Sequence, residues 1–184
     1  MKSLKALQTL AKIGKILSTI TFVLSIVVGA FCIAGIFSLL VFPADGFKLF
    51  GATIRGLMEK EADVSTATMY ATMSCGIILC AGEAVLAKFA ERYFKNELKA
   101  GTPFTFDGAK ELMRLGILAI CIPIGTAILS GIVYGIFKLA ATDVANPDIH
   151  SGASVGIGVM MIVGSLLCGH GAEISEKPEE QTTE

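Results

Sequence analysis

The sequence contains few residues that can carry out acid–base, nucleophilic or metal chemistry. Its two histidines, His150 and His170, are about 30 Å apart when the segment between them is helical, so they cannot ligate one metal ion or one haem. No His-Glu-x-x-His sequence, paired metal-ligating carboxylates, phosphate-binding glycine loop or Ser/His/Asp grouping is present. We therefore expect no catalytic residue, no metal site and no cofactor, and we predict that the protein is not an enzyme.

Glu83 is the ionisable side chain with the strongest claim to an intramembrane role, because it directly follows the uncharged residues 64–82. An intramembrane carboxylate is a candidate functional group, either in a proton- or cation-linked role or paired with Lys110 or Arg114. The alternative is that Glu83 reaches toward the lipid headgroups and has no special role.

Pro123 and the cysteines are the remaining unusual residues of the apolar segments. Pro123 offers no N–H to the carbonyl of Ala119, so we expect a bend that opens a pocket, acts as a hinge or is only structural. The five cysteines contain no Cys-x-x-Cys pair and all lie in apolar segments. We interpret them as packing residues: Cys32, Cys75, Cys80, Cys121 and Cys168.

The composition indicates a membrane protein. Of the 184 residues 53% are hydrophobic and 17% are charged, whereas a soluble domain has about 25% charged residues. Four segments without Asp, Glu, Lys, Arg or His are each long enough for the roughly 20 residues that cross a bilayer. This excludes a soluble enzyme, and the net charge of −1 gives no electrostatic argument for binding nucleic acid.

We predict an all-α membrane protein with four transmembrane helices in a bundle, at about residues 16–42, 64–87, 115–137 and 151–170. These spans belong to one domain, residues 1–172. Residues 88–114 form an extended cytoplasmic helical hairpin between the second and third spans, and the acidic residues 173–184 form a disordered tail. The first span is not a cleaved signal peptide, because its apolar stretch exceeds the roughly 7–15 residues of such peptides.

The distribution of Lys and Arg predicts that both termini are cytoplasmic, because basic residues are retained on that side of the membrane. The N-terminal segment contains four lysines, the 88–114 connection contains six Lys or Arg residues, and the tail contains Lys177. The two remaining connections contain only Lys48, Arg55, Lys60 and Lys138.

Two segments outside the spans have amphipathic spacing. Leu4, Leu7, Ala11 and Gly14 form an apolar stripe, which predicts a helix at the headgroups that continues into the first span. In the first outer connection, residues 43–63, apolar residues recur at near-helical spacing. We expect a short amphipathic helix there, capped by Asp45 and built on Phe47, Phe50, Ile54, Leu57 and Met58.

The 88–114 connection continues the second span as a helix. Lys99-Ala100-Gly101 predicts the end of this helix, with a cation in its last turn and Gly101 at the C′ position. Pro103 follows in a tight reversal, and Phe104 is free to plug the hairpin or the membrane interface. Thr105 or Asp107 then begins the next helix. Gly101, Pro103 and Phe104 are therefore candidate functional residues.

Small residues four apart mark places where two membrane helices can approach closely. Lipid is as apolar as leucine, so close backbone contact, rather than burial, brings membrane helices together. The positions that we expect in helix packing are Gly29 in the first span, Gly131 and Gly135 in the third, and Gly152 and Gly156 in the fourth.

The stretch AERYFKNELKAGTPFT, residues 90–105, and the later Leu112-Met113-Arg114-Leu115-Gly116 allow one comparison with a known family. They resemble the cytoplasmic hairpin of the small bacterial four-span membrane proteins of domain-of-unknown-function family 2975. In that family a helix ends in a Gly-x-Pro-Phe element, and the next helix enters the third span with an Arg-x-Gly pattern. The resemblance covers the hairpin closely and the spans only by their layout. It implies a bacterial cytoplasmic membrane and a four-helix plan, and it implies no activity.

These observations favour a non-enzymatic integral membrane protein that acts through helix packing, by self-association or as an accessory or regulatory partner of a membrane complex. The alternative is a small transporter or channel formed by the bundle or its oligomer, with Glu83 and Pro123 involved. We expect the partners to be membrane lipids and either a second copy of the chain or another membrane protein, and no nucleic acid.

Overall fold

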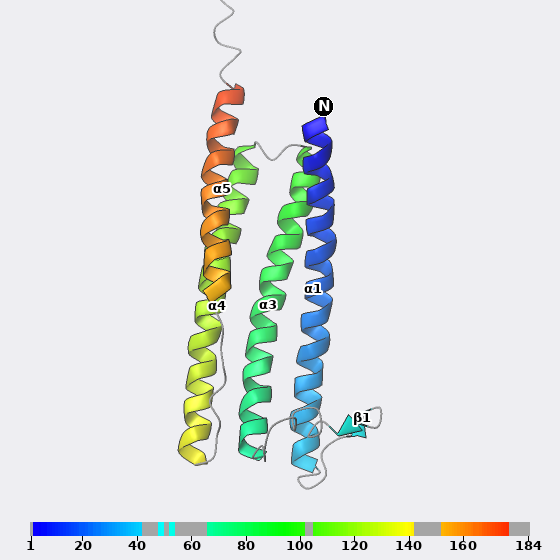
Figure 1. Cartoon of the computed structure of the whole chain (residues 1–184), viewed down its shortest axis with the longest axis vertical. Helices are drawn as coiled ribbons and strands as arrows, with labels where there is room; N and C mark the ends of the chain where they lie inside the picture. Colours follow the sequence, from blue (N-terminus) through cyan, green and yellow to red (C-terminus); the bar gives the residue numbers. More distant parts are fainter. Residues whose placement is uncertain are drawn as a thin grey trace, which may run out of the picture. The chain divides into compact units, whose positions relative to one another are not determined.

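The computed structural model describes residues 2–41, 48–49, 52–53, 66–101, 105–141 and 152–176. Most of these residues form the helices labelled in Figure 1: α1 (Lys2–Val41), α3 (Thr66–Ala100), α4 (Phe106–Ala140) and α5 (Gly152–Glu176). All four are long and apolar enough to cross a membrane. The prediction of four apolar helices is confirmed, whereas their packing as a bundle and the cytoplasmic position of residues 88–114 stay predictions.

Three of the helices are longer than a membrane crossing requires. α1 has 40 residues, and α3 and α4 have 35 each. A helix of 35 residues is about 52 Å long, so a part of it extends beyond a hydrocarbon core of about 30 Å. In α3 and α4 the charged residues identify that part: they begin at Glu83 in α3 and end at Arg114 in α4, before the uncharged run.

α1 continues without a break from its lysine-rich start into the apolar segment. The described members of its N-terminal stripe face protein: Ala11 is 3% exposed, and a Cβ on Gly14 would lie 2.6 Å from the Phe94 ring of α3. The stripe therefore contacts a neighbouring helix at these positions, and the expected location of this segment at the headgroups stays a prediction. Gly14 permits this contact because it leaves room for the aromatic ring.

Between α1 and α3 the structure has a two-residue strand pair where we expected a helix. β1 (Lys48–Leu49) and β2 (Ala52–Thr53) pair antiparallel, with Lys48 opposite Thr53 and Leu49 opposite Ala52. The helix prediction is wrong at these residues. Gly51, which the sequence places between these two strands, disfavours a helix. The expected helix-forming residues Phe47, Phe50, Ile54, Leu57 and Met58 lie outside the described residues.

The chain divides into two compact units, and α1, α3 and α4 each contribute a part to both. The first unit comprises Met1–Val23, Glu83–Ile124 and Ser151–Glu184, and the second comprises Leu24–Gly82 and Gly125–His150. The single domain expected over residues 1–172 stays a prediction.

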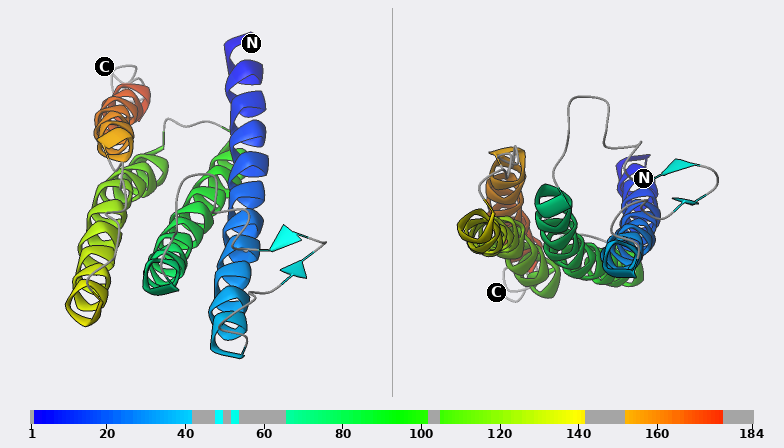
Figure 2. Two further views of the ribbon diagram at one scale, coloured as in Figure 1. Left: turned by 60° about the horizontal axis from the view of Figure 1, so that its bottom comes forward. Right: turned by 90° about the horizontal axis from the view of Figure 1, so that it is seen from below.

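In the first unit, the end of α3 lies between the beginnings of α1 and α4 (Figures 1 and 2). The Asn96 side-chain amide on α3 donates hydrogen bonds to both carboxylate oxygens of Glu111 on α4, at 2.8 and 3.1 Å. The two antiparallel helices are thus joined by a polar contact in their charged parts.

The α4–α5 contact of the first unit depends on two glycines. A Cβ on Gly116 would lie 3.0 Å from the carbonyl oxygen of Gly158, and a Cβ on Gly158 would lie 2.9 Å from the carbonyl oxygen of Gly116. A Cβ on Gly158 would also collide with the side chain of Ile120. The two backbones therefore approach too closely for any residue with a side chain, which is the contact expected between helices in lipid.

In the second unit, α1 and α3 pack through a small apolar cluster. Leu39, Met69 and Met73 are buried at its centre, and partly buried side chains surround them: Cys32, Ile36 and Tyr70. Small residues bring the same helices together elsewhere, since a Cβ on Gly29 would lie 3.5 Å from the Cβ of Cys80.

The turn between α3 and α4 follows local rules at both of its described ends. α3 ends at Ala100, and Gly101 has φ +75°, the left-handed conformation that glycine adopts without strain. Its N–H donates to the carbonyl of Glu97 at 3.0 Å. At the other end, the Thr105 hydroxyl accepts a hydrogen bond from the N–H of Gly108 at 3.0 Å, so Thr105, and not Asp107, caps α4.

α5 is longer than the sequence indicated. It continues to Glu176, so residues 173–176 are helical where the tail was expected to begin. Two exposed side chains one turn apart approach each other in this region, with His170 Nδ1 3.6 Å from Glu173 Oε2. The remainder of the expected tail lies outside the described residues.

Replacing Gly158 with alanine is expected to destabilise the protein by about 1–3 kcal/mol, because the new methyl group overpacks the α4–α5 contact. Gly156→Ala is the matched control: it lies on the same helix, and no described atom lies within 4 Å of a Cβ there. It should leave the stability unchanged or raise it slightly, as alanine is the better helix former. Unfolding of both variants in mixed micelles, followed by circular dichroism, checks this. Equal stability of the two variants would contradict the α4–α5 contact.

Candidate functional site

The residues with potential chemistry do not come together. Glu83 is an exposed residue of α3. Among the described residues no group of three or more His, Cys, Asp or Glu side chains is close enough to hold a metal ion. Of the two histidines, His170 lies near Glu173 within α5. His150 lies outside the described residues.

Pro123 lies inside α4, which remains helical on both sides of it. Two cavities lie along the charged parts of α3 and α4, and neither Glu83 nor Pro123 is among the residues that line them. The bend expected at Pro123 stays a prediction. Of the candidates in the turn, Gly101 is described, whereas Pro103 and Phe104 lie outside the described residues.

The glycines expected to pack helices differ in their surroundings. Gly29 has a neighbour on α3, as described above. No described atom lies within 4 Å of a Cβ built on Gly131, Gly135 or Gly156. The surroundings of Gly152 are outside the described part of the chain. Among the described residues, Gly116 and Gly158 bring two helix backbones into close contact, and the four-residue spacing did not identify this pair.

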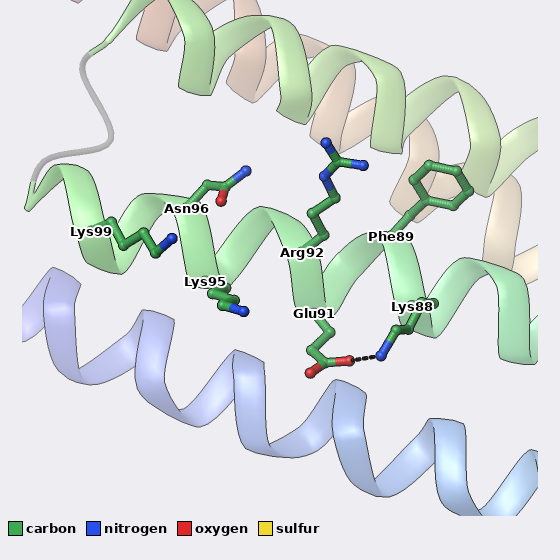
Figure 3. Close-up of a pocket in the computed structure, with 7 residues that line it drawn as sticks. All are labelled: Lys88, Phe89, Glu91, Arg92, Lys95, Asn96 and Lys99. Carbon is green, nitrogen blue, oxygen red and sulfur yellow. Dashed lines mark hydrogen bonds and ion pairs between the residues drawn. The ribbon is translucent and has the colours of Figure 1, made fainter.

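The basic residues of α3 form a continuous stripe along the helix, which we call the α3 basic stripe: Lys88, Arg92, Lys95 and Lys99. Spacings of three and four residues place them on one face, and all four are exposed. They line a cavity of about 460 Å³ together with Phe89, Glu91 and Asn96. Figure 3 shows Arg92 and Asn96 pointing toward α4, and Lys88 and Glu91 on the side of α3 that faces α1.

A second cavity, of about 360 Å³, lies between α3 and α4. It adjoins the first, because Phe89 and Arg92 line both. Arg114 contributes a second guanidinium, and the remaining lining is largely apolar: Tyr93, Leu115, Ile117 and Leu118, with Glu111 at the polar end. The two cavities thus form a concave surface that is basic over α3 and apolar toward the third predicted span.

Both carboxylates of this surface are already engaged. Lys88 Nζ donates to Glu91 Oε2 at 2.9 Å and also lies 5.0 Å from the centroid of the Phe22 ring. The hydrogen bond from Lys88 lowers the pKa of the Glu91 carboxyl. Glu111 accepts both hydrogen bonds from Asn96. Within the part of the chain that the structure describes, neither Arg92 nor Arg114 forms an ion pair.

A third carboxylate, Glu97, lies one turn after Tyr93 on α3, outside the predicted span. Burial raises the pKa of the Glu97 carboxyl, and a hydrogen bond from the Tyr93 hydroxyl opposes this effect in part. Burial and the nearby Glu97 carboxylate also raise the pKa of Tyr93. Tyr93 is therefore a neutral hydrogen-bond donor at physiological pH.

Sequence reasoning located the charged hairpin residues but did not identify their arrangement. The positions 88, 92, 95 and 99 differ by four, three and four residues, which is sufficient to place them on one helix face. The participation of Arg114 and of the apolar residues of α4 requires the contact between α3 and α4, which no spacing within one helix reveals.

The chain was compared with protein-family models, curated proteins and solved structures, and it matches none of them. The resemblance of its 90–116 segment to domain-of-unknown-function family 2975 stays an expectation.

Glu97→Gln is expected to stabilise the protein at about pH 7.5 and to change little near pH 4. Because the folded-state pKa is raised above the ordinary value of 4.5, ionisation of Glu97 disfavours folding as the pH rises through this range. The matched variant Glu91→Gln should act with the opposite sign. Because the pKa of Glu91 is lowered, its contact with Lys88 stabilises the fold at a pH above the ordinary carboxyl pKa of 4.5. This contribution is lost on acidification, as Glu91 becomes protonated.

Thermal unfolding of the detergent-solubilised chain between about pH 4 and pH 8 measures both effects, which we expect to be on the order of 2 °C for Glu97→Gln. Shifts of the same sign in the two variants at neutral pH would contradict the difference in burial between the two carboxylates.

Proposed function

We propose that this chain is a non-enzymatic integral membrane protein with four spans, both termini in the cytoplasm and a location in a bacterial cytoplasmic membrane. It acts through contacts between helices, first of all with a second copy of itself. The length and composition of the four helices support the membrane location. The concentration of Lys and Arg in residues 1–15 and 88–114 supports the orientation.

The observation that carries the proposal is the unoccupied glycine face of α4. Gly131 and Gly135 are four residues apart, and no described atom lies within 4 Å of a Cβ at either position. Gly116, on the same helix, is filled by α5. Within the described residues, the chain thus uses one glycine contact internally and leaves another without a neighbouring helix.

The surroundings of these glycines favour a helix as the occupant. Ile128, Ile132 and Ile136 flank them, and each is more than half exposed. Two glycines beside a row of branched side chains allow a second helix to bring its backbone close, and in lipid this contact supplies the dispersion energy that burial does not. Two copies of the same face fit each other with twofold symmetry.

A role as accessory or regulatory partner of another membrane complex would use the same face with a different helix. A small transporter or channel has less support, because neither of the described cavities includes Glu83 or Pro123.

Replacing both glycines with leucine, Gly131→Leu and Gly135→Leu, is expected to weaken self-association by at least about tenfold, because leucine side chains separate the backbones. Energy transfer between donor- and acceptor-labelled copies, titrated against lipid in proteoliposomes, measures the association constant. Gly125→Leu is the matched control. It also faces no described atom, and it lies on the same helix about 9 Å before Gly131 and about 15 Å before Gly135 along the axis, outside the glycine pair.

Self-association that is unaffected by the double substitution would contradict the assignment to this face. A wild-type chain that is monomeric in proteoliposomes, and is recovered from membranes without a partner protein, would overturn the proposed function.

A further inference from the structure

We propose that the two adjoining cavities on α3 and α4 bind an anionic glycerophospholipid, with its phosphate at Arg92 and Arg114 and the upper part of an acyl chain along α4. This inference does not depend on self-association, because the glycine face of α4 and these cavities share no residue. We call the surface the α3–α4 lipid site: Phe89, Arg92, Arg114, Ile117 and Leu118.

The two cavities carry an excess of positive charge. The linings of the two cavities include five cations: Lys88, Arg92, Lys95, Lys99 and Arg114. They also include two carboxylates, and each of these has its own partner, Lys88 for Glu91 and Asn96 for Glu111. The surface is therefore strongly positive toward a ligand, and basic pockets between membrane helices bind anionic headgroups.

Two exposed arginines, Arg92 and Arg114, line the cavities without an ion pair to any described residue. Arg92 belongs to both cavities, Arg114 lines the second, and both side chains are exposed. A guanidinium presents a planar set of N–H donors that matches two phosphate oxygens, and two of them from facing helices can hold a phosphate between α3 and α4.

The apolar part of the second cavity favours a lipid over other anions. The second cavity continues from Arg114 over Leu115 to Ile117 and Leu118, at the beginning of the predicted third span, with Phe89 on the opposite side. Ile117 is 47% exposed although it lines this cavity. A free phosphate or an acidic protein segment would satisfy the arginines and leave the apolar side uncovered. A phospholipid supplies both a phosphate and a hydrocarbon chain, in the order in which the cavity presents their partners.

The test uses the full chain in a non-ionic detergent, titrated with dioctanoyl phosphatidylglycerol and followed by native mass spectrometry. Dioctanoyl phosphatidylcholine has the same chains without net charge, and glycerol 3-phosphate has the phosphate without chains. We expect the anionic lipid to bind at least about tenfold more tightly than either, since it alone makes both sets of contacts. Raised salt should weaken its binding.

Arg114→Gln and Lys110→Gln form a matched pair for this titration. Both residues are exposed and lie one turn apart on α4, and each substitution removes one positive charge. Lys110, however, lines neither cavity. Arg114→Gln is expected to lose at least about tenfold in affinity, and Lys110→Gln no more than about twofold. Arg92→Gln, on the other helix, should behave like Arg114→Gln, and circular dichroism confirms that each variant is folded.

Four results would overturn the proposal. Equal affinities for phosphatidylglycerol and phosphatidylcholine would show that the site does not distinguish a charged headgroup from a neutral one. An affinity for glycerol 3-phosphate equal to that for phosphatidylglycerol would assign the surface to a soluble phosphate. Displacement of the lipid by a hexaglutamate peptide of similar affinity would assign it to an acidic protein segment. Equal losses in Arg114→Gln and Lys110→Gln would reduce the effect to general electrostatic attraction.

Discussion

The four apolar helices meet one constraint of a membrane environment: a backbone in hydrocarbon has no water to bond with and must satisfy its own N–H and C=O groups. Long unbroken helices meet this requirement, and α4 remains helical even through Pro123. Several hydroxyl groups bond to the backbone of their own helix, whereas the buried Oγ atoms of Ser38 and Ser130 have no hydrogen-bond partner among the described residues. Ser18 and Thr19 both donate to the carbonyl of Lys15, and similar bonds to the preceding turn are made by Thr21, Thr72 and Ser165.

Within this constraint, two kinds of contact hold neighbouring helices together. Where the chain is apolar, contact requires close approach of backbones, as at Gly116 and Gly158. Beyond the apolar runs, where water reaches the protein, polar side chains contribute, as in the Asn96–Glu111 hydrogen bonds. The change from one kind of contact to the other follows the charge pattern of the helices.

α4 links the two proposed activities of the molecule. Its beginning contributes Arg114 and the apolar residues after it to the lipid site, and its second half contributes Gly131 and Gly135 to self-association. The physical requirements differ: the first needs unpaired guanidinium groups beside an apolar surface, and the second needs the absence of side chains. A protein of this kind would respond to the lipid around it and to a second copy through one helix, without any reacting group.

The sequence by itself determined the four membrane-length helices, their apolar segments and the end of α3 at Gly101, because these depend on local properties: the length of an uncharged run, the missing side chain of glycine, and the spacing of charges. It did not determine which small residues touch. Gly131–Gly135 has the better spacing, yet Gly116 and Gly158 make the contact, because helix offset and rotation are set by both partners. The meeting of Arg92 with the Arg114 side of α4 was likewise decided by tertiary structure, since it joins residues on two helices whose relative position no single helix specifies.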